Sequence, residues 1–463
     1  MAYTTINPYT NETVKTFPEA TDAEVQQAIS DAHNAFLSWR NVSFADRAKI
    51  MNNAGAILRR DIDKYARLLT LEMGKLYSEA KAETILSAEI FEYYASHAEA
   101  LLKDEPLPVA SALEGKAVLK HQPQGVIFAV EPWNFPFYQI ARIIAPQLSA
   151  GNTVLLKHAS NVPQSAAIFE ALMTEAGLPA GAFRNLYLAR SHTEMIISDP
   201  RVCGAALTGS EGAGSVVATI AGKYLKKVTM ELGGSDAFIV LEDADIDKAA
   251  KWAAFGRHWN AGQVCVSAKR IIVVESVYER FLERYKAEVA KLRAGDPMDP
   301  STTLAPLSSQ KAADDLKAQV EEAKKLGAVV EEIGAVVPEQ GAFFRPLLMT
   351  NLHSDNAARH WEFFGPVTQL YKAADEADAI RIANDSPFGL GGSVFTGNEQ
   401  RGVKVAEQIY TGMVYINHPT MVKADLPFGG VARSGFGREL IGLGIKEFVN
   451  HKLINVVDID APF

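Results

Sequence analysis

Apolar residues recur at the spacing of amphipathic helices through the N-terminal part of the chain. The segment from Thr21 to Glu24 has the form of a capping box, and apolar residues follow it at helical spacing as far as Trp39. The same pattern predicts two further helices, over about residues 44–60 and 61–102. Pro106 and Pro108 lie just beyond them, so we expect a helical region that ends near residue 106.

Beyond about residue 125, short runs rich in β-branched residues alternate with helical patterns. The predicted strands are residues 126–130, 153–156, 185–188, 204–207 and 227–230. The predicted helices between them are residues 136–149, 163–176 and 212–223. Such alternation is typical of βαβ units around a parallel sheet, which binds ligands at the carboxyl ends of its strands.

A second alternating region follows, and it predicts another α/β domain. Its expected strands are residues 236–240, 270–274, 366–371, 393–395 and 413–417. Two β-prone segments, 115–122 and 453–459, belong to neither region, and we expect them to form a small projecting sheet. The fold class is therefore α/β, with two doubly wound domains and a small β-sheet.

Composition narrows the classes of function. The 463 residues are 48% hydrophobic and 22% charged, and 55 acidic residues against 46 Lys and Arg give a formal charge of −9. The sequence has no block of basic residues of the kind that indicates nucleic-acid binding. No apolar run approaches the ~18 residues that a membrane-spanning helix needs. We see no signal peptide, and the two cysteines predict neither a disulfide scaffold nor a metal site. We therefore expect a cytoplasmic protein.

One of the two cysteines lies in a setting suited to chemistry. Cys265 follows Asn260-Ala261-Gly262, so small residues would let a substrate approach its thiol. A thiolate is a strong nucleophile. The alternative is a buried structural cysteine, which suits Cys203 beside the predicted strand 204–207.

A glutamate and an asparagine follow predicted strands. Glu231 precedes two glycines, and in a crevice desolvation would raise its pKa towards the range of a general base; the alternative is a solvated loop glutamate. Asn134 in Pro132-Trp133-Asn134-Phe135-Pro136 could donate its amide to an oxyanion, although an Asx-turn would also place asparagine there. Tyr138 and Arg142 follow at intervals of four, so all three side chains could share one face.

Two strand ends could meet a dinucleotide. The segment 208–214, which contains Gly209 and Ser210, joins a strand to a helix, and a helix N-terminus suits a pyrophosphate. Lys157 and Ser160 follow another strand and could meet an adenosine ribose. Each segment could equally be an ordinary tight turn between a strand and a helix.

Taken in order, these motifs resemble those of the aldehyde dehydrogenase superfamily from about Ile6 to Asn450. The motifs are Pro132-Trp133-Asn134-Phe135-Pro136, Thr208-Gly209-Ser210, Glu231-Leu232-Gly233-Gly234, Gly262-Gln263-Val264-Cys265, Glu362-Phe363-Phe364-Gly365-Pro366 and the segment from Pro427 to Gly435. The resemblance implies a cofactor-binding domain (1–106 and 126–232), a catalytic domain (233–432) and an oligomerisation sheet (107–125 and 447–463). It also implies a homo-oligomer, either a dimer or a tetramer.

The resemblance assigns roles to individual residues. Cys265 would be the nucleophile, Glu231 the base, and Asn134 with the Cys265 N–H the oxyanion hole. The residues expected to bind the cofactor are Trp133, Lys157, Ser160, Gly209, Ser210, Glu362 and Phe364. The reaction implied is NAD(P)-dependent oxidation of an aldehyde to an acid through a thiohemiacetal and a thioester.

Two features refine this expectation. Many NAD-preferring members carry a glutamate where this chain has Ser160, so we expect NADP to be accepted, with NAD possible. The chain is most similar to short bacterial succinate-semialdehyde dehydrogenases, in which Arg142 and Tyr138 would contact the substrate carboxylate. The alternative is that Arg142 pairs with a protein carboxylate.

Other activities remain open from the sequence. The chain could oxidise a different short aldehyde, transfer the acyl group to coenzyme A, act as a cysteine-dependent esterase without a redox step, or be a structural protein on this fold. Glu231 favours water over coenzyme A as the acyl acceptor.

Overall fold

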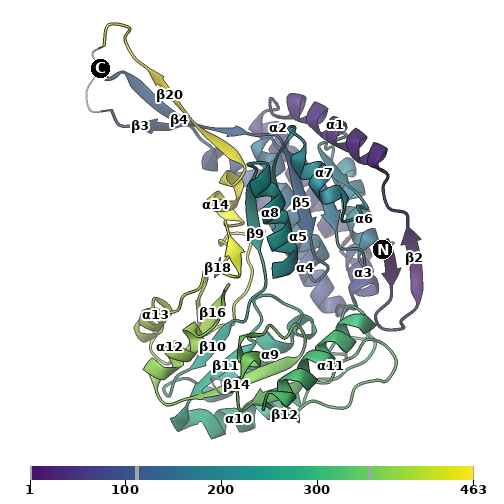
Figure 1. The fold of residues 1–463 in the computed structure, drawn as a ribbon, viewed down its shortest axis with the longest axis vertical. Helices are drawn as coiled ribbons and strands as arrows, with labels where there is room; N and C mark the ends of the chain where they lie inside the picture. The colour runs from purple at the N-terminus through teal and green to yellow at the C-terminus, as the bar shows by residue number, and fades with distance from the viewer. Residues whose placement is uncertain (1–2, 110–113, 353–355, 462–463) are drawn as a thin grey trace.

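The computed structural model describes residues 3–109, 114–352 and 356–461. Figure 1 shows two α/β lobes and a narrow sheet that projects from the first of them. The expected α/β class is confirmed.

The first lobe is built on a six-stranded sheet in the order β19-β9-β8-β5-β6-β7. Its parallel strands are β5 (Val126–Glu131), β6 (Thr153–His158), β7 (Phe183–Asn185), β8 (Val202–Thr208) and β9 (Lys227–Glu231). The short strand β19 (Gly435–Phe436) pairs antiparallel with β9. The chain therefore returns to the first sheet after completing the second lobe.

Helices cover both faces of this sheet. One face carries α5 (Pro136–Ala150), behind which lie α2 (Phe44–Arg60), α3 (Ile62–Met73), α4 (Tyr77–Leu101) and α6 (Pro163–Glu175). The other face carries α1 (Asp22–Trp39), α7 (His192–Ser198) and α8 (Glu211–Lys223). Successive side chains of each strand alternate between these two apolar cores.

Two elements of this lobe differ from the sequence-based expectation. The predicted helix 61–102 is two helices, because Gly74 adopts a φ of 78° that ends α3. The predicted strand 185–188 lies earlier, since only Phe183–Asn185 pairs with β6. Leu186 and Leu188 are apolar because they pack in the core beneath α1. The capping box of Thr21 and Glu24 is confirmed.

The second lobe has a seven-stranded sheet in the order β12-β13-β14-β11-β10-β16-β17. Its parallel strands are β10 (Ala237–Val240), β11 (Arg270–Val274), β13 (Leu347–Thr350), β14 (Val367–Ala373), β16 (Gly392–Phe395) and β17 (Tyr415–Ile416). The edge strand β12 (Val329–Glu332) is antiparallel, and neither it nor β13 was predicted.

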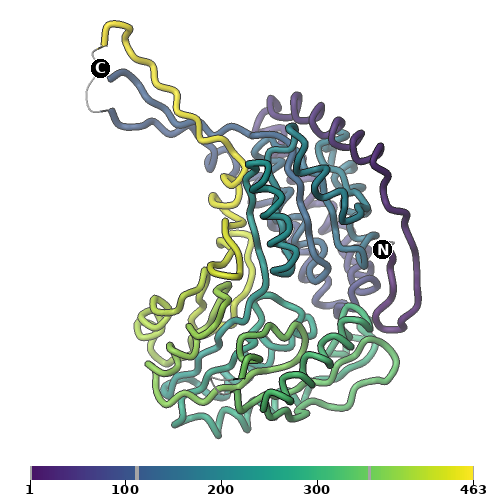
Figure 2. Tube along the Cα trace, viewed as in Figure 1, coloured from purple at the N-terminus to yellow at the C-terminus, as the bar shows by residue number. Residues whose placement is uncertain are grey.

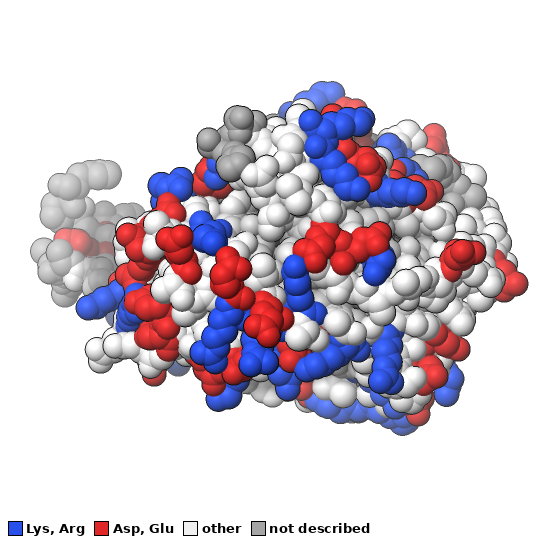
Figure 3. Space-filling view, turned by 90° about the horizontal axis from the view of Figure 1, so that it is seen from below, with Lys and Arg blue, Asp and Glu red and all other residues white. Residues whose placement is uncertain are grey.

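Helices also sandwich the second sheet. One face packs against α9 (Ile246–His258) and α10 (Glu275–Val289). The other packs against α11 (Gln310–Lys325), α12 (Glu376–Asn384) and α13 (Glu399–Ala406). Figure 3 shows the surface of the molecule from below, where acidic and basic side chains are interspersed among the described residues.

The projecting sheet consists of β3 (Glu105–Leu107), β4 (Lys116–Pro123) and β20 (Val449–Val456), all antiparallel. The tube in Figure 2 follows it away from both lobes. The predicted tail strand 453–459 starts four residues earlier, because β20 pairs with the whole of β4. Leu453 and Val456 of β20 are 59% and 67% exposed, so this sheet presents apolar side chains to solvent.

The remaining elements are short. They are β1 (Tyr3–Ile6), β2 (Thr13–Phe17), β15 (Phe388–Gly389), β18 (Val431–Ala432) and α14 (Ile441–Lys446). None of the helices described combines the length and the apolar character that crossing a membrane would require.

Candidate active site

A strained turn presents Cys265. The 3-10 helix η2 (Trp259–Gly262) contains Asn260 and Ala261, whose φ values of 52° and 53° are left-handed, and Gly262 continues the turn with a φ of 76°. A Cβ at Gly262 would lie 2.6 Å from the Gly365 carbonyl oxygen, so only glycine fits there. Left-handed conformations of other residues cost about 1–3 kcal/mol each, and they cluster at functional sites.

Cys265 borders a cavity of about 240 Å³ between the two lobes. The predicted site residues that line it are Trp133, Asn134, Gly209, Ser210, Cys265, Glu362 and Phe364. They come from strand ends and loops of both lobes. The structure therefore brings together seven residues that the sequence placed far apart.

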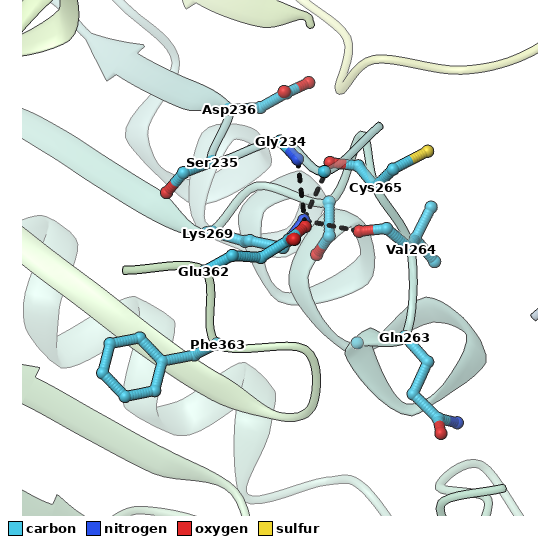
Figure 4. Close-up of polar contacts among 12 residues, drawn as sticks. Gly234, Ser235, Asp236, Gln263, Val264, Cys265, Lys269, Glu362 and Phe363 are labelled. Atoms are coloured by element: carbon cyan, nitrogen blue, oxygen red, sulfur yellow. Dashed lines mark hydrogen bonds and ion pairs between the residues drawn. The ribbon is translucent and has the colours of Figure 1, made fainter. Parts of the chain in front are cut away.

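The thiol of Cys265 points away from the side chains of Lys269 and Glu362, which lie on the other side of the loop (Figure 4). Figure 4 shows Lys269 beneath the loop, where its ammonium donates to the carbonyls of Val264 (2.6 Å) and Cys265 (2.8 Å). Burial raises the pKa of the Cys265 thiol to about 12, and the charges of Lys269 and Arg142 offset this only in part. Burial therefore favours the neutral thiol over the thiolate.

Asn134 is held in place by the same loop. Its side-chain amide donates to the Gln263 carbonyl at 3.1 Å. The backbone carbonyl of Asn134 accepts from the side chains of Lys75 and Asn260, each at 3.0 Å. An amide has two N–H groups, so one remains for an oxyanion. The role of Asn134 in an oxyanion hole stays a prediction.

Glu231 ends β9 and is only 2% exposed. Burial, with the nearby Glu439 carboxyl, raises the pKa of Glu231 well above its usual range. This agrees with the expectation of a desolvated carboxyl and not with a solvated loop residue. Glu231 does not line the cavity at Cys265.

The glycines after Glu231 let two groups approach closely. A Cβ at Gly234 would lie 2.6 Å from the Cys265 carbonyl oxygen, and one at Gly233 would collide with the Glu362 carboxylate. Glu362 accepts from the Gly234 N–H at 3.0 Å and pairs with Lys269 at 3.1 Å. The carboxylate is thereby oriented at the cavity wall.

Aromatic rings and a helix end complete the cavity. Trp133 and Phe364 meet edge to face, with 5.7 Å between ring centroids. Ser210 is the N-cap of α8 and accepts from the Ala213 N–H at 3.4 Å. A Cβ at Gly209 would meet nothing nearer than 3.6 Å, so this strand-to-helix turn is open to a ligand.

Lys157 and Ser160 lie away from this cavity, at the end of β6 and just beyond it. The pKa of Lys157 is lowered by burial and then by the positive charge of Arg190, which sequence reasoning did not single out. The Ser160 carbonyl accepts from the Thr4 N–H at 2.8 Å. Lys157 is therefore close enough to Arg190, and to the acidic Glu19, for their charges to act on it.

Arg142, expected to contact the substrate carboxylate, is held by groups of the protein. Arg142 is 2% exposed, forms an ion pair with Glu439, and donates to the hydroxyls of Tyr138 (3.0 Å) and Thr208 (2.7 Å). The side chain does not line the cavity at Cys265. The alternative considered for Arg142, a partner carboxylate within the protein, is what the structure shows. A contact with substrate stays a prediction.

The family model for aldehyde dehydrogenases, described as "Aldehyde dehydrogenase family", matches residues 1–454. This chain belongs to the aldehyde dehydrogenase family.

Named relatives within the family are closely similar. The succinate-semialdehyde dehydrogenase (NADP(+)) of Deinococcus radiodurans is 48% identical over 98% of this chain and 94% of its own length. Succinate-semialdehyde dehydrogenase (NADP(+)) 1 of Mycobacterium bovis is 46% identical over 98% of this chain and 99% of its own. The crystal structure of succinic semialdehyde dehydrogenase from Streptococcus pyogenes, in complex with NADP+ as the cofactor, has a TM-score of 0.96 and 45% identity, covering 99% of this chain and 100% of that one.

Sequence reasoning on this aldehyde dehydrogenase missed three charged residues near the site. Lys269 follows Cys265 by four positions, Glu131 ends an apolar strand, and Glu439 follows the glycine-rich C-terminal motif. All three are at least 95% buried. A charge that interrupts an apolar strand was the available indication for Glu131, since such residues are rarely buried without a partner.

Proposed function

We propose that this aldehyde dehydrogenase oxidises succinate semialdehyde to succinate with NADP. The observation that supports it most is the cavity at Cys265. Asn134, Glu362 and Ser210, the residues expected to bind the oxyanion, the nicotinamide ribose and the pyrophosphate, all line it. The identity of 48% to a succinate-semialdehyde dehydrogenase (NADP(+)) over nearly the whole chain supports the substrate and the cofactor.

Catalysis begins with the Cys265 thiol. Its pKa of about 12 must fall for the thiolate to form, and the neighbouring Lys269 and Arg142 favour the charged form. The thiolate attacks the aldehyde carbon and forms a thiohemiacetal. Asn134 and the Cys265 N–H donate to the oxyanion, which stabilises charge that develops only during the reaction.

The cofactor would be held by residues that fit a dinucleotide. The open turn at Gly209 and the N-terminus of α8 would receive the pyrophosphate, and Glu362, with Trp133 and Phe364 beside it, the nicotinamide ribose. The thiohemiacetal becomes a thioester when its carbon loses a hydride, and a bound nicotinamide would supply the hydride acceptor.

Glu231 would complete the turnover. A carboxyl with a raised pKa can take a proton from water near neutral pH, and the resulting hydroxide adds to the thioester carbon. The Cys265 thiolate then leaves and the acid is released. Glu231 does not line the cavity at Cys265, so its side chain would have to move to reach the water.

The preference for NADP rests on charge at the ribose end. Lys157 and Arg190 are both cationic, and Ser160 provides a hydroxyl without a negative charge. A 2′-phosphate would therefore be attracted by Lys157 and Arg190, although the carboxylate of Glu19 also acts on Lys157.

The substrate carboxylate would interact with Arg142. A guanidinium has five N–H groups, and the contacts with Glu439, Tyr138 and Thr208 account for three of them. The Arg142 side chain does not line the cavity at Cys265, so it would have to move before a distal carboxylate could accept from the other two.

A homo-oligomer and a cytoplasmic location belong to the same proposal. The exposed apolar residues of the projecting sheet, Leu453 and Val456, support association of like chains as a dimer or tetramer. The two cysteines are both free, which suits a reducing compartment. Light scattering during size-exclusion chromatography measures the subunit number directly, and a monomer would contradict the first part.

A panel of aldehydes tests the activity. Purified protein is mixed with succinate semialdehyde or butyraldehyde and with NADP or NAD, and the absorbance of the reduced nicotinamide is followed. We expect the highest kcat/KM for succinate semialdehyde with NADP. Hydrolysis of activated esters without any cofactor reduction would instead identify an esterase, and equal kcat/KM for both aldehydes would contradict the substrate proposed.

A further inference from the structure

A buried ion pair near the start of α4 lies beside the loop that carries Asn134. The ammonium of Lys75, two residues before α4, pairs with the Glu83 carboxylate, and the two side chains are 0% and 1% exposed. The same ammonium donates to the backbone carbonyl of Asn134 at 3.0 Å and lies 3.7 Å from the centroid of the Phe135 ring. A buried pair adds little net stability, because both charges lose their hydration. This pair does, however, fix the carbonyl of Asn134.

The other oxygen of Glu83 binds the first free N–H groups of α5. It accepts from the N–H of Phe137 at 2.8 Å and from that of Tyr138 at 3.2 Å. The N-cap residue of α5, Phe135, provides no side-chain acceptor. N–H groups at the start of a helix need a partner, and a carboxylate there also interacts favourably with the helix dipole. Glu83 thus fixes where α5 begins, directly after the Asn134 loop.

Glu79 holds the turn that presents Cys265. It lies four residues before Glu83, so the two carboxylates share one face of α4. Glu79 Oε1 accepts from the N–H of Asn260 at 3.0 Å, and Asn260 is one of the left-handed residues of η2. The start of α4 therefore binds backbone N–H groups of both lobes.

Side chains join the two loops to each other at the same place. Asn260 Nδ2 donates to the backbone carbonyl of Asn134 at 3.0 Å and to that of Gln263 at 3.2 Å. The Asn134 side-chain amide donates to the same Gln263 carbonyl at 3.1 Å. The Asn134 carbonyl thus has two donors, Lys75 and Asn260. A shift of that carbonyl would move the Asn134 amide relative to Cys265, which lies two residues beyond Gln263.

We propose that Lys75, Glu79 and Glu83 are positioning residues that hold the Asn134 amide in place for the oxyanion formed at Cys265. The inference rests on the proposed function, in which Asn134 belongs to the oxyanion hole. None of the three lines the cavity at Cys265, so they act through the backbone groups that they bind. Donors that are already in place stabilise an oxyanion as it develops. Their placement therefore affects the rate of reaction more than the binding of the aldehyde.

The first test is rapid-mixing kinetics of Lys75→Met with succinate semialdehyde and saturating NADP. Methionine has no donor for the Asn134 carbonyl, whereas Glu83 keeps its two N–H donors in α5. We expect the rate constant of cofactor reduction in the first turnover to fall by about tenfold or more, as for a displaced oxyanion donor. KM for the aldehyde should change little. An unchanged first turnover would overturn the proposal.

A double variant separates positioning from general damage to the fold. In protein that already carries Asn134→Ala, Lys75→Met has no side-chain amide left to place, so the first turnover should slow no further. Losses that multiply would mean that Lys75 acts elsewhere and would contradict positioning. Alkylation by iodoacetamide builds no oxyanion, so the Cys265 peptide should be alkylated as fast in Lys75→Met as in wild type. Equal slowing of alkylation and of cofactor reduction would also overturn the proposal.

Glu79 gives a second test that leaves the buried ion pair intact. Glutamine can accept from the Asn260 N–H as glutamate does, whereas leucine cannot. Glu79→Leu should therefore slow the first turnover by about tenfold, and Glu79→Gln should restore a rate close to that of wild type. Equal slowing of both variants would mean that the charge matters and not the hydrogen bond to Asn260. That result would contradict the proposal, as would two variants with the wild-type rate.

Glu72→Leu is the matched control. Glu72 is also buried, and its carboxylate accepts from the N–H groups of Gln164 (2.9 Å) and Ser165 (2.7 Å) at the start of α6. Its loss should lower stability but leave the first turnover unchanged at saturating NADP. Slowing as strong as that of Glu79→Leu would overturn the assignment. Wild-type protein that reduces no cofactor would contradict the proposed function, whereas equal first-turnover rates of wild type and Lys75→Met would contradict the positioning alone.

Discussion

The ion pair between Arg142 and Glu439 gives a prediction that the structure makes quantitative. The side chains are 2% and 6% exposed, so solvent screens their attraction little. Removing one partner of a buried pair leaves an uncompensated charge, so Glu439→Gln should lower the free energy of unfolding by about 3–5 kcal/mol. Glu131 and Glu231 lie near the Arg142 guanidinium and can ionise in place of Glu439, so we expect a loss at the lower end of that range.

The reciprocal variant should behave differently. Arg142→Met leaves Glu439 buried alone, but a carboxyl can take up a proton, whereas a guanidinium stays charged. The cost of Arg142→Met should therefore shrink as the pH falls, while that of Glu439→Gln should not. The double variant has no buried charge at either position and should be more stable than the sum of the two losses predicts, by about 2 kcal/mol or more.

Urea unfolding monitored by tryptophan fluorescence provides the assay. The order of unfolding midpoints should be wild type, then the double variant, then the two single variants. Losses that simply add, or a double variant less stable than both single ones, would refute the reasoning. The same Arg142→Met protein also tests substrate binding: a raised KM for succinate semialdehyde alone indicates a contact with its carboxylate, and equal effects on butyraldehyde indicate a structural role.

Three further outcomes follow from the site. Cys265→Ala should abolish aldehyde oxidation while Cys203→Ala keeps most of it, as steady-state rates will show; substantial turnover by Cys265→Ala would exclude the thioester route. Glu231→Gln should retain the burst of reduced cofactor in stopped flow but release acid slowly, and a lost burst would mean that Glu231 acts before hydrolysis. Ser160→Glu should shift the ratio of kcat/KM towards NAD, because a carboxylate repels a 2′-phosphate by about 1–4 kcal/mol at close range; an unchanged ratio would place Ser160 away from the ribose.

Much of the molecule follows from local pattern. The strands of the first sheet were predictable because buried parallel strands read as apolar runs, and the capping box of Thr21 and Glu24 is encoded within four residues. The break at Gly74 was missed because the apolar spacing continues on both sides of it. β19 was missed because two residues carry no recognisable strand pattern.

The site was predictable as motifs but not as geometry. Cys265, Asn134 and Glu362 lie in separate segments of the sequence, and the structure brings them to one cavity. Their roles stay predictions. The partner of Arg142 was not predictable, because Glu439 is distant in sequence and meets Arg142 only when the C-terminal segment returns to the first lobe. Glu131 was missed although it ends an apolar strand, because the sequence does not show which charged groups of other segments lie beside it.

Mass spectrometry of the quenched enzyme tests the central claim most directly. Glu231→Gln protein is mixed with succinate semialdehyde and NADP, quenched in acid and digested. The account predicts that the peptide containing Cys265 gains the mass of one succinyl group, that the peptide containing Cys203 does not, and that the gain requires NADP. An unmodified Cys265 peptide in the presence of a burst of reduced cofactor would contradict it.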